Sequence, residues 1–272
     1  MNAIRIVLPL FLFLSAVSAQ AATWTTIDVP GSKDGQAFGI NNAGDIVGYY
    51  NDGVKYLHGY LLRGGNFTTI VPPGGGGSLA TGVNDAGYIV GYFEFVNDPA
   101  RTHGFLFDGT NYTVLDFPGS NGSTIAWGIN NAGEVVGFYY DGQTNHGFRW
   151  SNGVYTTVDP PDSPFTQLYG INNFGQIVGW YEAPMEIQSF VLNAHEAFRY
   201  FGSYGQAASI NDHRVVVGYS PGFKFNLKTK AYVPLQFPDA LDTGCWGINN
   251  DGTIVGNYVD ASGTLHGFLR TK

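Results

Sequence analysis

The chain has 272 residues, a formal net charge of −8 and only 12% charged residues, whereas ordinary soluble domains carry about 25%. The acidic balance argues against nucleic acid or an anionic membrane surface as a partner, because both select a basic protein face. Cys245 is the single cysteine, which excludes an internal disulfide and a cysteine-based zinc site. With 44% apolar residues, a chain of this length can bury a core without either.

Residues 1–21 have the pattern of a secretory signal peptide. Arg5 is their only charge, an apolar run follows it, and the tripeptide at 19–21 places small residues at the two positions that signal peptidase inspects. The run is shorter than the ~20 residues that a membrane-spanning helix needs. We therefore expect cleavage before Ala22, no membrane span afterwards, and a single mature domain at 22–272 that is secreted or periplasmic in a bacterium.

One motif recurs six times in the mature chain. Each copy resembles Gly-Ile-Asn-Asn-Ala-Gly, followed by two β-branched residues, a glycine and aromatic residues. The apolar residue before the first Asn marks the copies at Ile40, Val83, Ile129, Ile171, Ile210 and Ile248. The intervals between these markers are 43, 46, 42, 39 and 38 residues. A period of this length, with β-type residues and no 3.6-residue periodicity, is typical of propeller blades.

Each repeat predicts two β-hairpins and hence four strands, named a to d from the axis outward. The first hairpin turns at Asn-Ala-Gly or a related triplet, where Asn and Gly accept left-handed backbone. The last repeat stops after its third strand at 266–270, and the mature chain opens with 24–28, which matches a fourth strand. We predict an all-β, six-bladed propeller of four-stranded antiparallel blades. The N-terminal strand would join the last blade and close the ring without an exposed sheet edge.

The repeat unit is similar to a known family. GINNAGxIVGYY followed by HGF or HGY resembles the bacterial probable extracellular repeat family named after its His-Ala-Phe (HAF) tripeptide, here with Gly in the middle position. The His occurs in four repeats, as His58, His103, His146 and His266, and is missing from repeats four and five. The resemblance covers essentially the whole mature chain. It implies an exported, propeller-like protein without an assigned reaction.

The two ends of the predicted ring differ in the variability of their loops. The a–b turns are short and uniform, whereas the b–c and d–a connections vary in length and composition. Because variable loops on a rigid scaffold carry function, we place the binding site on the b–c/d–a face, where aromatic rings could stack on a sugar. The predicted ligand-binding residues are Phe93, Glu94, Trp127, Tyr140, Asp141, Trp180, Tyr181, Glu182, Trp246 and Tyr258. The alternative is that the rings fill the wedges between blades.

Other motifs predict structural roles. The repeated His lies on the third strand, on the order of 15 Å from its counterpart in the next blade at ~4.8 Å per strand, which is too far for a shared metal. We expect each His to anchor its own b–c loop. The Asn-Gly turns lack the acids of a calcium loop, the glycines at 74–77 suggest a flexible connection, and Cys245 suggests a buried, inert thiol. We therefore predict no cofactor, no metal and no catalytic residue.

The sequence favours an exported, monomeric binding module that recognises a carbohydrate or a protein through the b–c/d–a face. The alternative is a polysaccharide hydrolase or lyase that uses Glu94, Glu182 or Asp141 at the channel mouth. Such a hydrolase would need two carboxylates about 5–9.5 Å apart. A third possibility is a purely structural surface module, which would have no concave pocket with converging polar groups.

Overall fold

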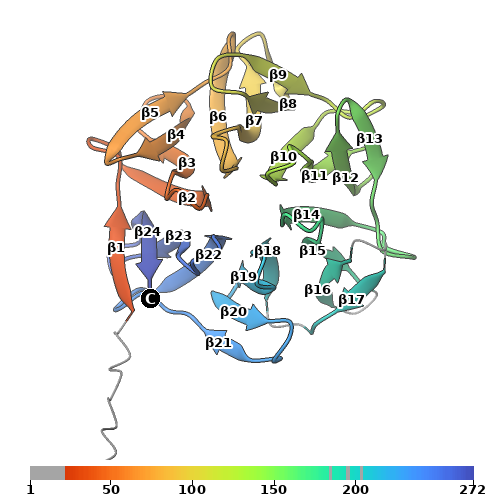
Figure 1. Ribbon diagram of the computed structural model, residues 1–272. Helices are drawn as coiled ribbons and strands as arrows, with labels where there is room; N and C mark the ends of the chain where they lie inside the picture. The colour runs from red at the N-terminus through yellow and green to blue at the C-terminus, as the bar shows by residue number, and fades with distance from the viewer. Residues whose placement is uncertain (1–21, 184–185, 194–196, 203–204) are drawn as a thin grey trace, which may run out of the picture.

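The computed structural model describes residues 22–183, 186–193, 197–202 and 205–272; the predicted signal peptide at 1–21 lies outside this part of the chain. The described residues form 24 strands in six four-stranded sheets, arranged as the blades of a propeller (Figure 1). This confirms the predicted fold class. The described segments contain no helix that is long and apolar enough to cross a bilayer.

Every blade is an antiparallel sheet whose strands follow one another from the axis to the rim. The innermost strands are β2 (Asp34–Ile40), β6 (Gly75–Val83), β10 (Thr124–Ile129), β14 (Thr166–Ile171), β18 (Gln206–Ile210) and β22 (Asp242–Ile248). The second strands are β3 (Ile46–Asn51), β7 (Ile89–Phe95), β11 (Val135–Tyr140), β15 (Ile177–Glu182), β19 (Val215–Tyr219) and β23 (Ile254–Val259). The third strands are β4 (Leu57–Arg63), β8 (Asp98–Phe107), β12 (Asn145–Ser151), β16 (Ile187–Leu192), β20 (Phe223–Asn226) and β24 (Leu265–Thr271). The outer strands are β5 (Asn66–Ile70), β9 (Tyr112–Leu115), β13 (Val154–Thr157), β17 (Phe198–Tyr200), β21 (Tyr232–Pro234) and β1 (Thr23–Ile27). Blades 1 to 6 are numbered in this order.

The N-terminal strand completes blade 6, as the sequence predicts. β1 pairs antiparallel with β24, and Trp24 lies opposite Arg270. The Asp28 carboxylate, just beyond β1, lies 3.0 Å from Nδ1 of His266 on β24. Blade 6 therefore combines strands from both ends of the described chain, and this pairing closes the ring.

A glycine and an aromatic ring pack against each other in every blade. The facing pairs on the second and third strands are Gly48–Tyr60, Gly91–Phe105, Gly137–Phe148, Gly179–Phe190, Gly218–Phe223 and Gly256–Phe268. All six rings are buried. A β-carbon on Gly91 would lie 2.8 Å from the Phe105 ring and 2.0 Å from the Leu79 carbonyl oxygen. Only glycine leaves room for the ring, which explains why glycine recurs after the β-branched pair.

Blade 2 departs from the sequence prediction in two places. Three glycines of the predicted flexible run, 75–77, belong to β6, and a β-carbon on Gly76 would lie 2.9 Å from the Tyr56 ring. The b–c connection of this blade, expected to be one of the variable loops, is mostly strand over 94–102, because β7 continues to Phe95 and β8 begins at Asp98. The glycines therefore allow a close approach between neighbouring blades, and Glu94 lies in a strand.

The a–b turns join all six blades through buried asparagines. The first Asn of each turn donates from its side-chain amide to the main-chain carbonyl of its counterpart in the next blade, at 3.0–3.3 Å. The six residues are Asn41, Asn84, Asn130, Asn172, Asn211 and Asn249. The last of these bonds runs from Asn249 back to Asn41, so the hydrogen bonds form a closed circle around the axis.

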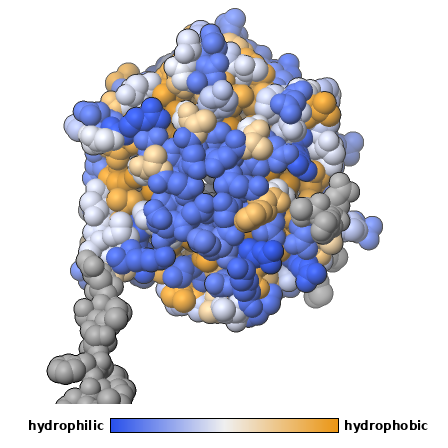
Figure 2. All heavy atoms as spheres, viewed as in Figure 1, coloured by the Kyte–Doolittle hydropathy of each residue, from blue (hydrophilic) through white to orange (hydrophobic). Residues whose placement is uncertain are grey.

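A second circle uses the next residue of each turn. Its main-chain N–H donates to the side-chain oxygen of its counterpart in the following blade, at 2.8–2.9 Å. The six residues are Asn42, Asp85, Asn131, Asn173, Asp212 and Asn250. Figure 2 shows the hydrophilic residues gathered around the axis on this end of the ring. The polar groups of the uniform turns therefore bind neighbouring blades together.

Candidate functional site

Each inner strand has a register shift that places one side chain against the central channel. The bulged positions are Phe38, Thr81, Trp127, Tyr169, Ala208 and Trp246. A bulge inserts one extra residue and re-aims the side chain there. Thr81 and Ala208 are small and belong to the opposite blades 2 and 5. The four large rings of the other blades share the space that these two leave.

These four rings close the channel in its middle. Trp127 and Trp246 belong to opposite blades, yet their ring centroids lie 5.7 Å apart. Phe38 lies 5.4 Å from each of them, and Tyr169 lies 4.6 Å from Trp127. Edge-on and tilted contacts of this kind stabilise aromatic clusters. We call these four rings the plug; they separate the turn end of the axis from the loop end.

A layer of half-buried side chains covers the plug on its loop side. This axial rim consists of Tyr49, Leu79, Tyr92, Ile125, Phe165 and the plug residue Trp246. Inner strands run from the loop end to the turn end, so Leu79 and Ile125, each two residues before a bulge, lie toward the loops. The Phe165 ring, from the loop before β14, stacks on Trp180 at 5.3 Å. The loop end of the axis therefore presents partly exposed rings.

Hydrogen bonds fix the rings of the plug. The Trp246 indole N–H donates to Oδ1 of Asn257 at 2.6 Å. The Trp180 indole N–H donates to the Tyr219 hydroxyl at 3.2 Å, and that hydroxyl donates to the Tyr169 hydroxyl at 3.3 Å. The network holds the rings in one arrangement beneath the axial rim.

The two tyrosines of the axial rim stay neutral over the physiological pH range. Burial, with a smaller contribution from the Asp34 carboxylate, raises the pKa of Tyr49 to about 12. Burial also raises the pKa of Tyr92 to about 12, with smaller contributions from Tyr49 and Glu94. Their hydroxyls can therefore both donate and accept hydrogen bonds, as recognition of a sugar hydroxyl requires.

The structure brings three of the ten predicted binding residues together around the axis. Trp127, Trp180 and Trp246 all belong to the aromatic cluster of the plug and rim. Phe93 and Tyr258 are buried in the wedges between blades, where Tyr258 stacks on a phenylalanine of the preceding blade. For these two rings the structure matches the alternative stated above, that they fill wedges.

The other five predicted residues lie toward the loop end of the second strands. Tyr140 and Glu182 are exposed, and Tyr181 and Glu94 are partly exposed. The Asp141 carboxylate accepts the main-chain N–H groups of its own loop and also contacts a histidine, as described below. These residues surround the axis at a distance from the plug rather than forming one cluster with it.

Sequence reasoning missed Tyr49, Tyr92 and Phe165. In the second strands two residues follow the glycine, and the first packs toward the axis while the second packs into a wedge. The predicted set took the wedge position in blade 2, Phe93, and omitted its neighbour Tyr92. The alternation of faces along a strand was the signal that separates the two positions.

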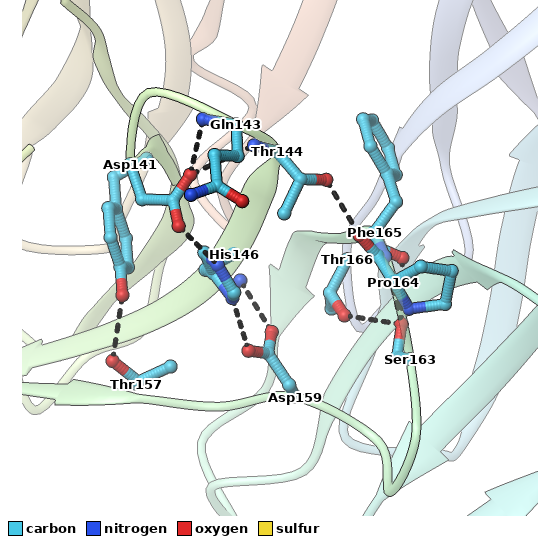
Figure 3. Close-up of polar contacts among 12 residues, drawn as sticks. Asp141, Gln143, Thr144, His146, Thr157, Asp159, Ser163, Pro164, Phe165 and Thr166 are labelled. Atoms are coloured by element: carbon cyan, nitrogen blue, oxygen red, sulfur yellow. Dashed lines mark hydrogen bonds and ion pairs between the residues drawn. The ribbon is translucent and has the colours of Figure 1, made fainter. Parts of the chain in front are cut away.

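The repeated histidine connects a loop to the outer strand, as Figure 3 shows for blade 3. Nδ1 of His146 lies 2.7 Å from the Asp159 carboxylate, and Nε2 lies 3.2 Å from Asp141 in the b–c loop. The same loop is held to the next blade by the Thr144 hydroxyl, which donates to the Pro164 carbonyl at 2.7 Å. This confirms the predicted loop-anchoring role of the histidine in this blade.

The other three histidines vary this arrangement. His266 contacts Asp28 and Asp260, and His58 contacts the loop residue Asp52 at 3.4 Å. His103 differs, because its Nδ1 pairs with Asp116 at the end of the outer strand and its buried Nε2 has no hydrogen-bond partner among the described residues. The prediction holds for blades 1, 3 and 6, and in blade 2 the extended β7–β8 hairpin replaces the anchored loop.

Opposing effects set the pKa of His146. Burial lowers it, but the hydrogen bonds and charges of Asp159 and Asp141 raise it more, so that the net pKa lies above the ordinary value of 6.5. The main-chain N–H groups of Thr144 and Gln143 lower the pKa of Asp141, and His146 lowers it further. The loop carboxylate is therefore ionised and occupied by its own loop.

Two features of the described ranges bear on metal and thiol chemistry: the clustering of metal-ligating side chains and the cysteine. Within them, no three His, Cys, Asp or Glu side chains converge closely enough to hold a metal ion. Cys245 is a buried free thiol, and burial raises its pKa to about 12. A thiol with such a pKa is protonated and a poor nucleophile at neutral pH, which matches the predicted inert role.

Comparisons with known proteins show the fold. No family model matches the sequence, and no curated protein matches it significantly. Among solved structures, a mutant of the Aleuria aurantia lectin in complex with Fucα1-6GlcNAc has 11% identity and a TM-score of 0.54, covering 90% of this chain and 93% of the lectin. The virginiamycin B lyase from Staphylococcus aureus has 8% identity and a TM-score of 0.50, covering 91% of this chain and 88% of the lyase.

A third similar structure comes from a protein complex. A chain of the nidogen/laminin complex has 10% identity and a TM-score of 0.52, covering 78% of this chain and 83% of its own length. At such identities the three likenesses establish a propeller fold and nothing about the reaction or ligand. The structure and these comparisons together identify the chain as a six-bladed β-propeller.

Proposed function

We propose that the protein is a non-catalytic binding module and that a carbohydrate binds at the axial rim, on the b–c/d–a face. The observation that supports this most strongly is the axial rim, whose partly buried aromatic rings, two of them neutral tyrosines, lie above a closed plug. The C–H face of a sugar ring packs well on an aromatic ring, and tyrosine hydroxyls exchange hydrogen bonds with sugar hydroxyls. The fold shared with the Aleuria aurantia lectin is compatible with this proposal.

Five of the predicted residues have supporting roles in this proposal. Trp127 and Trp180 support the rim from beneath, while Tyr140, Glu182 and Glu94 offer peripheral contacts from the ends of their strands. We further propose that the chain is exported and acts as a monomer. The signal-like segment at 1–21 and the resemblance to the HAF-type repeat family support the export.

A glycan array probed with the purified protein tests the carbohydrate site. We expect Tyr92→Ala and Phe165→Ala each to weaken glycan binding about threefold to tenfold, because each removes one stacking ring. Tyr88→Ala is the matched control, since Tyr88 is an exposed tyrosine in the a–b turn of the same blade. Unchanged binding in both rim variants would reject the axial rim as the site. Binding to proteins but to no glycan would favour the protein alternative.

The structure supports a polysaccharide hydrolase or lyase less well than it supports a binding module. Of the three acids considered for such a role, Asp141 already accepts two main-chain N–H groups and pairs with His146. A carboxylate engaged in this way is poorly placed to act as a general acid. The engagement of Asp141 bears on that acid alone, and the axial rim is the reason that we propose binding rather than polysaccharide cleavage.

A further inference from the structure

A groove of about 460 Å³ lies at the turn end of the ring, between blades 4 and 5. It is lined by Phe174 and Gln176 of one a–b turn, Arg214 of the next, the β17 residues Arg199 and Tyr200, and residues around the β20–β21 turn that include Lys228 and Lys230. It lies at the opposite end of the ring from the axial rim, so its role is independent of the proposed function.

The groove concentrates positive charge on an acidic protein. Four of its lining residues are cationic, namely Arg199, Arg214, Lys228 and Lys230, and none of the described lining residues is acidic. All four cations are exposed. Arg63 and Arg149 are the arginines in ion pairs among the described residues, and both lie elsewhere. With 13 basic against 21 acidic residues in the chain, this cluster is a local site of attraction for anions.

Two of the cationic residues have a left-handed backbone conformation, which residues with a β-carbon rarely adopt. Arg214 has φ 62° and Lys230 has φ 60°. Arg214 stands where the other five a–b turns have a positive-φ glycine, at Gly44, Gly87, Gly133, Gly175 and Gly252. Left-handed backbone costs free energy for residues with a β-carbon, and such strain concentrates at functional positions. An arginine in place of the favoured glycine is best explained by a role for its guanidinium group.

The backbone also fixes these cations relative to one another. The Arg214 carbonyl accepts the Leu227 N–H at 3.0 Å, which ties the a–b turn to the β20–β21 turn. The Lys230 N–H donates to the Asn226 carbonyl at 2.8 Å. The groove therefore carries its charges on a preorganised pair of turns, which lowers the entropy cost of binding.

An exposed aromatic ring adjoins the cations: the Phe174 side chain is 64% exposed. The Tyr200 ring instead packs on Tyr181, on the face of blade 4 that is turned toward blade 3. The residue equivalent to Phe174 is small or polar in every other repeat, as Ala43, Ala86, Ala132, His213 and Asp251. Rings suit the C–H face of a sugar, and the cations suit carboxylate or sulfate groups. An acidic peptide fits less well, because the neighbouring outer strands β17 and β21 have three residues each and offer little edge for strand pairing.

We propose that this groove binds an acidic polysaccharide. Arg199, Arg214, Lys228 and Lys230 pair with its carboxylate or sulfate groups, and the Phe174 ring supports a sugar ring. Carboxylated and sulfated polysaccharides have in common a chain of sugars with regularly spaced negative charges. The probes below distinguish the two kinds of polymer.

Binding of the purified protein to three probes tests the proposal: polygalacturonate, dextran sulfate and uncharged dextran. We expect binding to at least one charged polymer, no binding to dextran, and weaker binding at higher salt. Lys228→Ala/Lys230→Ala should weaken binding about tenfold or more, and Arg214→Gly should weaken it severalfold. The matched control is Lys33→Ala/Lys55→Ala, which removes the same charge from exposed loop-end positions and should leave binding unchanged.

The aromatic contribution separates a saccharide from other polyanions. Phe174→Ala should weaken polygalacturonate or dextran sulfate binding several-fold and leave any weak binding of poly-glutamate unaltered. All of the replaced side chains are exposed, so thermal unfolding should confirm an intact fold in each variant. The proposal is overturned if neither charged polysaccharide binds at low salt, if the loop-end control loses as much affinity as the groove variant, or if poly-glutamate binds more tightly than both polysaccharides.

Discussion

Blade 4 has a groove on each side. The two grooves are similar in size, but in one the charges are paired, and in the other no described lining acid pairs with the cations. The groove between blades 3 and 4 measures about 430 Å³, and that between blades 4 and 5 about 460 Å³. In the first, Arg149 pairs with Glu134, and Asp159 pairs with His146. In the second, four cations line the groove, and none of the described lining residues is an acid. The same scaffold therefore builds one neutralised groove and one anion-attracting groove.

The difference originates in the last residue of the a–b turn. Blades 1 and 3 have an acid there, Asp45 or Glu134, which pairs with an arginine of the third strand. Blade 4 has Gln176 and blade 5 has Val215 at the same position. The hydrogen-bond circles and the glycine–aromatic pairs leave this position free to vary. Repeats can thus acquire different surfaces without a change in fold.

The largest expected effect concerns the neutralised groove. Glu134→Ala removes the partner of Arg149 and also the acceptor for the Asn130 side-chain amide. We expect the free energy of unfolding to fall by about 2 kcal/mol, because hydrogen bonds to charged groups are worth roughly 1.5–3 kcal/mol. Urea denaturation measures this loss. The pKa of Glu134 agrees with the reasoning, since burial raises it but Arg149 and Asn130 lower it to below its ordinary value.

Thr253→Ala provides the matched control for this prediction. Thr253 occupies the same turn position in blade 6, and only its main-chain groups form hydrogen bonds among the described residues. We expect a change within about 0.5 kcal/mol. Equal losses in the two variants would show that the turn position itself, rather than the ion pair, carries the stability.

The repeats explain why the fold was predictable from the sequence. Hairpin turns and the glycine–aromatic pairs occur in units that pack alike, and the extra N-terminal strand matches the fourth strand that the last repeat lacks. An ambiguous unit such as blade 5, which lacks the His-Gly-Phe triplet, is interpreted correctly because its neighbours fix the pattern. The ring closure followed from Trp24 and its neighbours matching an outer strand.

The sites were harder to predict, for two physical reasons. The bulge at Trp127 inserts one residue, so the alternation of faces changes phase within the strand and a ring assigned to the loop face lies in the plug instead. The cationic groove was missed because its charges come from separate segments. Arg199, Arg214 and Lys228 lie 14–15 residues apart in sequence, and only the packing of blade 4 against blade 5 brings them together.

A reciprocal exchange of residues sharpens the comparison between the grooves. Arg214→Gly should stabilise the protein by about 0.5–1 kcal/mol. The substitution removes the strain of a left-handed arginine, and this gain exceeds the conformational entropy that a glycine loses on folding. Gly175→Arg places the same residue on the neutralised groove. A β-carbon at Gly175 meets no atom within 4 Å, and its φ is +69°. We expect this variant to lose about 1 kcal/mol from conformational strain alone.

Thermal and urea unfolding of both variants measure these changes. Opposite signs for the two variants are the expected result. If Arg214→Gly destabilised the protein, Arg214 would be a structural residue, and the strain argument for the anion-binding groove would be wrong. If it stabilised the protein and also weakened polyanion binding, stability and binding would oppose each other at one residue, as expected for strain retained for function.

The smallest expected effect is a pH dependence of stability that involves the neutralised groove. The folded pKa of His146 lies above 6.5, so folding favours its protonated form. Its stabilising contribution is present below about pH 6.5 and is lost as the pH rises through the folded pKa. Asp141 has a lowered pKa and stays ionised through this window. Solvent screening at the partly exposed pair keeps the change under about 1 kcal/mol.

Urea midpoints at about pH 5.5 and about pH 8.5 measure this dependence. His146→Gln should reduce the difference between the two midpoints, because it removes the group whose pKa shifts. His213→Gln is the control: His213 is exposed in the blade 5 turn, and the pH difference should persist in this variant. An unchanged pH difference in His146→Gln would mean that other groups dominate the titration. A reduced difference would show that the contacts of His146 with Asp141 and Asp159 stabilise the fold more in acid than in base. The groove between blades 4 and 5 has no such pair among its described residues, so it lacks this source of pH dependence.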